Sequence, residues 1–356
     1  MHQPRSVLVT GGAGFIGSNF LLALVPRCPE VRFVNLDLLT YAGNLLNLRA
    51  VEGAPGYAFV RGDVADADLV QRLFAEHDFD TVVHFAAESH VDRSILDPLA
   101  FVRTNVVGTA TLLEAARQAW STPAGIRDDV RFHHVSTDEV FGTLGDTGAF
   151  DEATPYDPRS PYSASKAGSD HLARAYHHTY GLPVTVSNCS NNYGPFQFPE
   201  KLVPLVIRNA AAGAPLPVYG EGQNTRDWLH VADHVDALDL VLRAGTPGET
   251  YAVGGRAERR NLEVVETLAD LVDAHLGRAP GTARGLITFV TDRPGHDWRY
   301  AIDPSKTEQT LNWQPAHSFE SGLRATVDWY LTHPAWLDAV ADASYRAYYA
   351  TQYDSR

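Results

Sequence analysis

Val7-Leu8-Val9-Thr10-Gly11-Gly12-Ala13-Gly14-Phe15-Ile16-Gly17 is the stretch that decides the fold. An apolar run ends in a glycine-rich turn, and a helical pattern follows over residues 18–25. The glycines fit G-x-G-x-x-G from Gly12 and G-x-x-G-x-x-G from Gly11. Glycines here permit a tight turn, and the N-terminus of the next helix offers amides to a pyrophosphate. The stretch predicts a dinucleotide-binding turn, although the glycines alone leave a purely structural turn open.

Asp37 strengthens the dinucleotide interpretation. It ends the second strand-like run, 20 residues after Gly17, where a carboxylate can accept hydrogen bonds from ribose hydroxyls. A carboxylate repels a 2′-phosphate, and the next residues are leucines rather than an arginine, so NAD is favoured over NADP. Asp63, at the end of the third run, is either a partner for the adenine edge or the N-cap of the following helix.

Strand-like and helical patterns alternate through the first half of the chain. Further runs rich in β-branched residues cover residues 31–36, 57–60, 81–86, 130–135 and 184–186. Helical patterns lie between these runs, at residues 66–76, 102–119 and 162–180. Such alternation is typical of a parallel sheet with helices on both faces. The predicted class is therefore α/β, with a doubly wound parallel sheet of the NAD-binding Rossmann type.

The regular alternation fades after about residue 190, where glycine and proline become frequent. We expect residues 1–190 to form the NAD-binding domain and residues 191–356 to form a smaller C-terminal α/β substrate-binding lobe. Within that lobe, residues 262–276 have a helical pattern, and the segment near 229–256 is expected to return to the main sheet as a strand at 250–254. The stretch from Pro334 onward carries no usable motif.

Two short motifs carry the chemistry. Ser136-Thr137-Asp138-Glu139 places two carboxyls beside a hydroxyl, and paired carboxyls in one pocket can act as one acid and one base. Tyr162 follows 23 residues after Glu139, and Lys166 lies four residues further, on the same side of a helix. A Lys⁺ beside a phenol favours the phenolate, which is a general base. The alternatives are an exposed helical Tyr–Lys pair and acidic capping of a helix.

Composition excludes several partners. A net charge of −14 argues against nucleic acid and against an anionic membrane surface. Two cysteines, Cys28 and Cys189, form no metal motif and no disulfide framework, which fits a reducing cytoplasm. No secretory signal and no run of about 18 apolar residues is present. The fifteen histidines show no metal-ligand spacing, so no metal is expected.

The chain resembles the extended short-chain dehydrogenase/reductases that modify nucleotide sugars, and within them the dTDP-glucose 4,6-dehydratase family. The Thr137-Asp138-Glu139 triplet is specific, since the epimerases of this superfamily usually lack the Asp-Glu pair. Phe141 departs from the tyrosine that is common in the family, which removes one supporting hydroxyl. The match extends over nearly the whole chain and includes residues 37–44, 86–94, 136–142, 191–201, 226–228 and 292–297.

The resemblance implies a reaction in three stages on dTDP-glucose. Tyr162 deprotonates the C4 hydroxyl as the C4 hydride passes to NAD⁺, Thr137 hydrogen-bonds the same oxygen, and Lys166 lowers the tyrosine pKa. Glu139 then removes the C5 proton while a protonated Asp138 donates to the departing C6 hydroxyl. The hydride finally returns to C6, which gives dTDP-4-keto-6-deoxyglucose and water.

The resemblance also implies two sets of binding residues. Ser89 and Ser136 border the nicotinamide and the sugar, and residues 217–219 line the base pocket. The cofactor set is Gly11, Gly14, Phe15, Ile16, Gly17, Asp37, Thr40, Gly43, Asp63, Val64, Ala86, Ala87, Ser89, Thr104, Ser136, Tyr162 and Lys166. The substrate set is Ser89, Thr137, Asn191, Glu200, Lys201, Leu202, Pro217, Tyr219, Arg226, Asn261, Arg293 and His296, with the two arginines on the diphosphate.

Several alternatives stay open at the level of sequence. A UDP-linked 4,6-dehydratase or a 4-epimerase would also use NAD and Tyr162. A UDP-glucuronate decarboxylase would need a cation where this chain has two acids. A non-catalytic NAD sensor would need no general base. The thymidine or uridine preference is not decided. We also expect a homodimer with a four-helix interface from helices 102–119 and 162–180, on which Ala110, Leu113, Ala173 and Tyr176 are the small and apolar residues noted.

Overall fold

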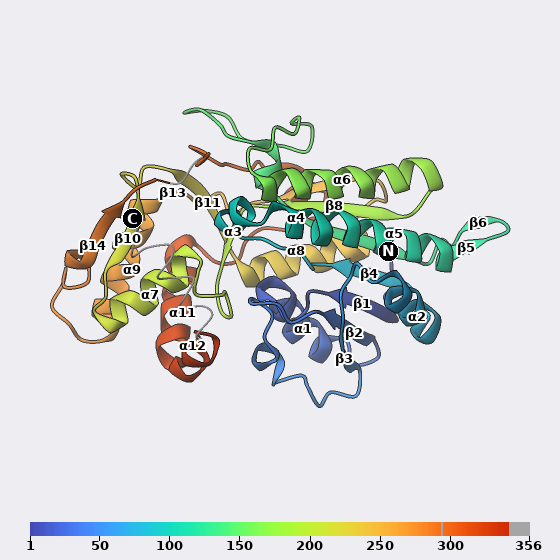
Figure 1. The fold of residues 1–356 in the computed structure, drawn as a ribbon, viewed down its shortest axis with the longest axis horizontal. Helices are drawn as coiled ribbons and strands as arrows, with labels where there is room; N and C mark the ends of the chain where they lie inside the picture. The colour runs from blue at the N-terminus through green and yellow to red at the C-terminus, as the bar shows by residue number, and fades with distance from the viewer. Residues whose placement is uncertain (293–294, 342–356) are drawn as a thin grey trace.

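A seven-stranded parallel sheet lies at the centre of the protein in a computed structural model that describes residues 1–292 and 295–341 (Figure 1). The strand order is β3-β2-β1-β4-β7-β8-β12, and every neighbouring pair is parallel. The predicted doubly wound α/β sheet is confirmed. The strands are β1 (Ser6–Thr10), β2 (Arg32–Asp37), β3 (Tyr57–Arg61), β4 (Thr81–His84), β7 (Arg131–Thr137), β8 (Val184–Cys189) and β12 (Thr250–Val253).

The central strand β1 shows how the two faces of the sheet are covered. Val7 and Val9 belong to a core formed with α1 and α8, whereas Leu8 belongs to a second core formed with α2, α5 and α6. Side chains alternate across a strand, so a continuous apolar run is buried on both faces. The helices are α1 (Phe15–Arg27) and α8 (Val231–Ala244) on one face, and α2 (Ala67–His77), α5 (Thr109–Trp120) and α6 (Pro161–Tyr180) on the other.

The helix predicted over residues 102–119 is not α-helical throughout. Its first part, Val102–Gly108, is a π-helix that follows α3 (Val91–Leu96) and α4 (Pro98–Phe101) and leads into α5. Asn105 in this π-helix accepts a bond from the Glu88 amide (2.9 Å) and donates to the Glu88 carbonyl (3.0 Å) and the Ser165 hydroxyl (2.8 Å). Single π-helical turns often occur at functional sites, and this one fixes the segment that follows β4.

The second half of the chain builds a smaller lobe with two short sheets. β9 (Asn191–Tyr193), β11 (Thr225–His230) and β13 (Glu258–Arg260) form one sheet, and β10 (Leu216–Tyr219) pairs with β14 (Ile287–Val290) in the other. The core of this lobe lies between the helices α7 (Leu202–Ala212), α9 (Asn261–His275), α11 (Phe319–Thr332) and α12 (Pro334–Val340).

The two halves are interleaved. β12 pairs in parallel with β8 at the edge of the main sheet, although the chain has passed through β9, α7, β10 and β11 in between. α10 (Ser305–Leu311) packs on β12. The remaining elements are η1 (Leu45–Leu48), β5 (Ser121–Thr122), β6 (Gly125–Ile126), η3 (Asp138–Phe141) and η4 (Arg284–Leu286).

No helix of residues 1–292 and 295–341 is long and apolar enough to cross a membrane.

Candidate active site

The carboxyl end of β7 presents the Thr-Asp-Glu triplet. Thr137 is the last residue of the strand and the N-cap of η3, where its hydroxyl accepts a hydrogen bond from the Glu139 amide at 3.3 Å. The same hydroxyl donates to Asp138 Oδ1, also at 3.3 Å. The short η3 helix begins directly after β7 and carries both carboxyls, those of Asp138 and Glu139. Capping and catalysis are therefore compatible roles for Thr137.

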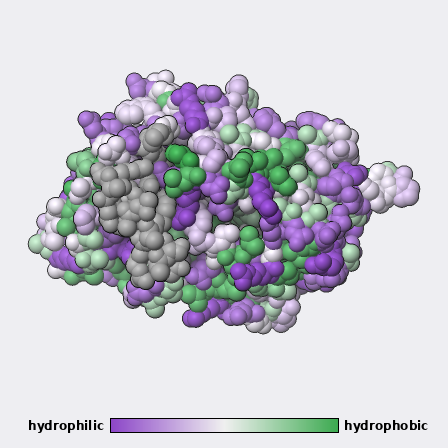
Figure 2. All heavy atoms as spheres, viewed as in Figure 1, coloured by the Kyte–Doolittle hydropathy of each residue, from purple (hydrophilic) through white to green (hydrophobic). Residues whose placement is uncertain are grey.

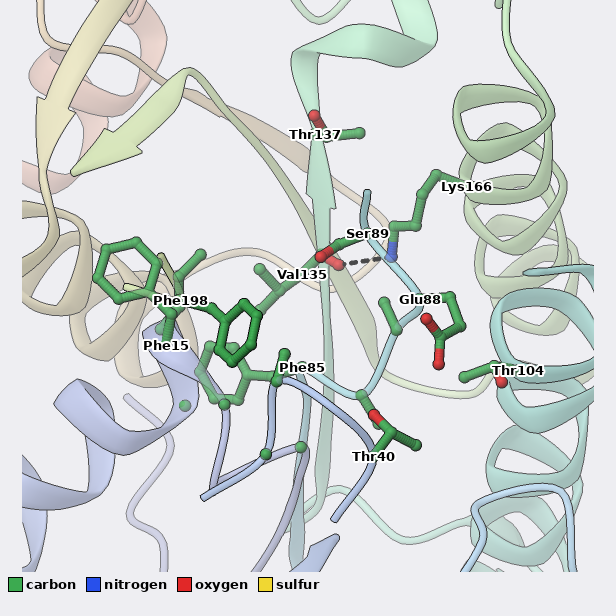
Figure 3. Close-up of a pocket in the computed structure, with 18 of the residues that line it drawn as sticks. Phe15, Thr40, Phe85, Glu88, Ser89, Thr104, Val135, Thr137, Lys166 and Phe198 are labelled. Atoms are coloured by element: carbon green, nitrogen blue, oxygen red, sulfur yellow. Dashed lines mark hydrogen bonds between the residues drawn. The ribbon is translucent and has the colours of Figure 1, made fainter. Parts of the chain in front are cut away.

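Tyr162 and Lys166 reach the same place from the start of α6. Ser160 caps this helix through reciprocal bonds with Ser163, and Pro161 occupies the first helical turn. Tyr162 and Lys166 are 7% and 4% exposed, so the pair is not an exposed helical pair. Lys166 Nζ donates to the Val135 carbonyl at 2.9 Å, which Figure 3 shows as a dashed line between β7 and α6.

Burial dominates the electrostatics of this pair. It raises the pKa of Tyr162 well above its usual value, Glu139 raises it further, and a hydrogen bond with Thr137 lowers it. Burial also lowers the pKa of Lys166, whose ammonium hydrogen bond goes to a backbone carbonyl. The hydrogen bond with the Thr137 hydroxyl favours the phenolate form of Tyr162.

Asp138 and its neighbour Glu139 lie in different surroundings. Asp138 is 2% exposed, and its Oδ2 has no hydrogen-bond partner among the described residues. Burial therefore holds the pKa of Asp138 well above its usual value, Glu139 raises it further, and Arg226 opposes both. Glu139 is only partly buried and lines the cavities on both sides. Burial thus favours the protonated form of Asp138, and the neighbouring Glu139 reaches the open site; such a difference in surroundings can separate an acid from a base.

A buried aspartate that the motifs did not reveal lies behind the pair. Asp170, one further turn along α6 from Lys166, is fully buried. Its carboxylate accepts hydrogen bonds from Ser136 (2.9 Å), His134 (3.1 Å) and Tyr156 (2.8 Å). Burial pushes the pKa of Asp170 upward, but the hydrogen bond from His134, the charge of Lys166 and the bond from Ser136 lower it overall. The i, i+4 spacing of Asp170 after Lys166 was the available sequence signal.

A cavity of about 300 Å³ runs from the glycine-rich turn to this edge of the sheet. It is lined by every residue of the predicted cofactor set: Gly11, Gly14, Phe15, Ile16, Gly17, Asp37, Thr40, Gly43, Asp63, Val64, Ala86, Ala87, Ser89, Thr104, Ser136, Tyr162 and Lys166. Phe85, Glu88 and Phe198 also line the cavity and were not predicted. In Figure 3, Phe15, Phe85 and Phe198 lie on one side of the cavity, and Thr104 and Lys166 on the other.

The geometry of the turn fits a dinucleotide. Gly11 has φ +71°, and a Cβ atom there would lie 2.6 Å from the Ala86 amide nitrogen, so only glycine fits. The Asp37 carboxylate accepts bonds from the Leu39 amide (2.8 Å) and the Ala13 amide (2.9 Å). Burial raises its pKa, and these two bonds oppose the shift. A carboxylate held by two amides keeps further lone pairs for the hydroxyls of a ribose.

Asp66, and not Asp63, caps α2, because the Asp66 side chain accepts the Leu69 amide at 3.0 Å. The capping alternative for Asp63 is therefore wrong. Asp63 accepts the Ala65 amide at 2.8 Å and lines the cofactor cavity.

A second cavity, of about 160 Å³, lies between the sheet edge and the smaller lobe. It shares Glu139, Asn191, Glu200 and Lys201 with the first cavity, so the two cavities adjoin each other. Of the predicted substrate residues, Ser89 and Thr137 line only the first cavity and Arg293 lies outside the described residues. The second cavity is lined by Asn191, Glu200, Lys201, Leu202, Pro217, Tyr219, Arg226, Asn261 and His296, and also by the unpredicted His90, Asp92, Trp228 and Tyr300.

Arg226 is held in place within the second cavity. It is 4% exposed, its guanidinium lies 4.2 Å from the centroid of the Tyr300 ring, and it donates to the Asp297 carbonyl at 2.9 Å. A fixed planar guanidinium suits the bidentate binding of a diphosphate.

Glu200, which lines both cavities, is held by an ion pair. Its carboxylate accepts a bond from Arg93 at 2.9 Å, and the Arg93 guanidinium lies 3.7 Å from the centroid of the Tyr41 ring. Lys201 next to it donates to the Ser89 carbonyl at 3.0 Å. These contacts tie the loop after β2, helix α3 and the entry to α7 together at the boundary of the two cavities.

Comparison with known proteins gives one consistent result. A family model described as GDP-mannose 4,6 dehydratase matches residues 8–326. The chain is 61% identical over 341 residues to a dTDP-glucose 4,6-dehydratase of Xanthomonas campestris pv. campestris, which covers 95% of this chain and 97% of that protein. It is 50% identical to dTDP-glucose 4,6-dehydratase 1 of Escherichia coli K12, over 98% of this chain and 99% of the relative.

Solved structures agree with the sequence relatives. DesIV, a dTDP-glucose 4,6-dehydratase from Streptomyces venezuelae solved with NAD and TYD bound, superposes with a TM-score of 0.86 at 47% identity, over 94% of this chain and all of that one. A UDP-glucose 4-epimerase from Thermus thermophilus with NAD superposes with a TM-score of 0.81 at 31% identity, over 92% of this chain and all of that one.

Proposed function

The chain belongs to the GDP-mannose 4,6-dehydratase family, and we propose that it converts dTDP-glucose to dTDP-4-keto-6-deoxyglucose and water. NAD is the cofactor, and when bound in the first cavity it accepts the hydride from C4 of the sugar and returns it to C6. The observation that carries the proposal is Asp138, whose buried Oδ2 has no hydrogen-bond partner among the described residues, beside the half-buried Glu139.

In the first stage Tyr162 takes the proton of the C4 hydroxyl. Thr137 donates a hydrogen bond to the same oxygen as its negative charge develops, and Lys166 holds the nicotinamide ribose. Both Tyr162 and Lys166 project from the first turns of α6, so the base stays fixed relative to the end of β7. The stage ends with a ketone at C4, which makes the C5 proton acidic.

In the second stage the two carboxyls divide the work. Glu139 takes the C5 proton, and Asp138 gives its proton to the C6 hydroxyl, which leaves as water. Glu139 then returns its proton to C5 as C6 becomes a methyl group. The proton that Tyr162 took replaces the one that Asp138 gave, so the enzyme is restored and the overall change is the loss of one water molecule.

The other candidate functions lack this support. A 4-epimerase uses the base Tyr162 but has no use for a buried acid beside a carboxylate, and this chain is less similar to the epimerase structure than to the dehydratase structure. A UDP-glucuronate decarboxylase needs a cation where Asp138 and Glu139 lie. An NAD sensor needs no base in the position of Tyr162. A UDP-linked sugar remains the alternative substrate.

We propose that two copies associate through the surface of α3, α4, the π-helix and α5, with α6 beside them. Leu96 and Leu99 are 70% and 76% exposed, and Ile95, Val102 and Val107 are also exposed on this surface. Figure 2 shows hydrophobic residues gathered over these helices. Leu113 and Ala173, noted from the sequence, are instead buried in the core of the chain itself. Exposed apolar area of this kind favours a homodimer.

We also propose a division of labour along the chain. Residues 1–190 hold NAD, residues 191–356 hold the nucleotide sugar, and the segment near 229–256 rejoins the sheet. The two adjoining cavities at this boundary support the division. Both cysteines are buried and unpaired, which supports a reducing cytoplasmic setting.

The proposal is tested by separating the two stages. Glu139→Gln removes the C5 base and leaves Tyr162 in place, so addition of dTDP-glucose should produce enzyme-bound NADH absorbance in a single turnover. Dehydration should fall by roughly 10²-fold or more. Exchange of the C5 proton with deuterated solvent should fall with it, and free NADH should not accumulate.

Glu76→Gln, an exposed carboxylate on α2, is the matched control and should behave as the wild type. Dehydration by Glu139→Gln at the wild-type rate would contradict the assigned base. If the wild type forms no 4-keto product from dTDP-glucose, the proposed reaction is wrong.

A further inference from the structure

Helix α12, the last helix of the described residues, reaches the cofactor-binding turn through hydrogen bonds. The Trp336 indole nitrogen donates to Asn47 Oδ1 at 2.8 Å, although the two residues are 289 positions apart. Asn47 Nδ2 in turn donates to the Ala13 carbonyl at 2.9 Å. The Ala13 amide donates to Asp37 Oδ2 at 2.9 Å. The series thus runs from the last described helix to the carboxylate that faces the cofactor cavity.

The chemistry of the groups fixes the direction of every bond in this series. An indole N–H can only donate and a backbone carbonyl can only accept, so Asn47 must turn its oxygen to Trp336 and its amide to Ala13. No other orientation of the Asn47 amide satisfies both neighbours. The side chain of Asn47 is therefore fixed in orientation, and it shares the Ala13 carbonyl with the Asn44 amide, which donates to the same oxygen at 3.0 Å.

Burial makes these bonds matter. Asn47 is 2% exposed and Trp336 is 9% exposed, so water does not readily replace either partner. Leaving a buried acceptor without its donor costs more than an average hydrogen bond contributes. In Figure 1, α12 lies next to the blue segment that follows β2, which is the segment that holds Asn47.

The same helix also supports a second wall of the cofactor cavity. The Trp336 ring packs 5.9 Å from the rings of Phe196 and Tyr330, measured between centroids. Tyr330 donates to the Gln197 carbonyl at 2.8 Å, and Gln197 lines the cofactor cavity. The indole hydrogen bond of Trp336 thus supports the glycine-rich turn, whereas its ring packing supports the wall that contains Gln197. A substitution that removes only the indole N–H therefore tests the first contact and leaves the second in place.

We propose that Trp336 is a positioning residue that acts through Asn47 on the glycine-rich turn and so slows the release of NAD. The inference rests on the use of NAD in the proposed function and adds a role for the C-terminal helix. A reaction that returns its hydride within one turnover fails whenever the reduced cofactor leaves, so slow release is what the chemistry demands of this turn. Trp336 does not touch the reacting atoms.

Trp336→Phe in the full-length holoenzyme is the test, because it removes the indole N–H and keeps an aromatic ring. We expect NAD to dissociate about tenfold faster, because the loss of one buried hydrogen bond changes a rate by about this factor. The purified protein should also carry less NAD. Turnover with saturating NAD and nucleotide sugar should stay within about twofold of the wild type, since the reacting groups are untouched. Trp329→Phe is the control, since Trp329 packs on Trp336 and Phe196 but takes no part in the series of bonds.

An unchanged NAD dissociation rate in Trp336→Phe overturns the proposal, and so does an equal acceleration in Trp329→Phe. Asn47→Leu supplies a second route and should accelerate dissociation at least as much, while the double variant Asn47→Leu/Trp336→Phe should release NAD no faster than Asn47→Leu alone. Additive effects in the double variant would show that Trp336 acts elsewhere. The dissociation rate is measured without sugar, so a failure of the proposed reaction would appear separately, as a wild type without product.

Discussion

The cofactor cavity and the substrate cavity are built in different ways. The first is lined at the carboxyl ends of successive strands of one sheet, where backbone groups and glycines set its shape. The second is lined by side chains from segments that extend from His90 to Tyr300, brought together by packing between the lobes. This difference shows that the regular sheet positions the reacting residues, whereas the residues that would select the nucleotide sugar are brought together by contacts between distant segments.

The two cavities are nevertheless coupled by charge. Arg226 lines only the substrate cavity, yet it opposes the upward shift of the Asp138 pKa. A diphosphate that neutralises Arg226 would weaken this opposition and favour the protonated acid. Substitutions in the cofactor cavity and in the substrate cavity therefore test whether a change in one cavity alters the function of the other.

The largest effect is expected at the sheet edge. Tyr162→Phe removes the base of the first stage and should lower turnover by roughly 10³-fold, within the range for a lost general base. No NADH absorbance should build up on addition of dTDP-glucose. Tyr180→Phe, at the exposed end of the same helix, is the control and should be unaffected. NAD reduction by Tyr162→Phe at a normal rate would mean that the base is another group.

Asp138→Asn should lower turnover by roughly 10²-fold and let bound NADH accumulate, because it acts after C4 oxidation. Burial raises the pKa of Asp138, so the carboxyl is protonated at low pH and loses its proton as the pH rises through that raised value. Stopped-flow measurement of the elimination step should therefore show a decline at high pH in the wild type. If Asp138→Asn keeps the same decline, Asp138 is not the group that titrates.

On the substrate side, Arg226→Lys should raise the KM for the nucleotide sugar by roughly 10-fold, because an ammonium cannot bind a diphosphate in two places. NAD occupancy and the pattern of enzyme-bound NADH should change little, since the cofactor cavity is intact. Steady-state kinetics and cofactor analysis of the same preparation measure both. Arg284→Lys, in an exposed ion pair with Asp270, is the matched control. A decrease in kcat without a change in KM would contradict this expectation, because it would show that Arg226 acts on the reaction rather than on binding of the nucleotide sugar.

The smallest effect is expected behind the site. Phe141 stacks on Phe150 and meets Tyr156 edge-on, with both centroid distances at 5.1 Å. Phe141→Tyr adds the hydroxyl that the family resemblance leads one to expect here, and turnover should stay within about threefold of the wild type. The free energy of unfolding should fall by about 1 kcal/mol unless the new hydroxyl finds a partner in this apolar cluster. Denaturant unfolding and turnover assays decide the matter, and a large gain in turnover would mean that the hydroxyl acts in catalysis.

The sequence allowed the sheet and the chemical motifs to be predicted because both depend on local patterns. The glycine-rich turn, Asp37 and the Tyr162–Lys166 spacing are short-range features with a fixed place at strand ends. Asp170 was missed because its role depends on partners from β7 and from the segment that holds Tyr156. The contacts of Glu200 with Arg93 were missed for the same reason, and no local pattern of residues 191–341 distinguishes a cavity wall from an ordinary turn.

The late return of β12 to the sheet has a consequence for synthesis of the chain. When β8 has left the ribosome its outer edge is unpaired, and it stays so until residues 250–253 are made. An unpaired strand edge is a template for pairing with another chain, and parallel pairing over long sequence separations forms slowly. The nascent chain therefore exposes the unpaired edge of β8 while the residues of the smaller lobe are being synthesised. Chaperone demand and inclusion-body formation should track the length of that delay more closely than the stability of the finished enzyme.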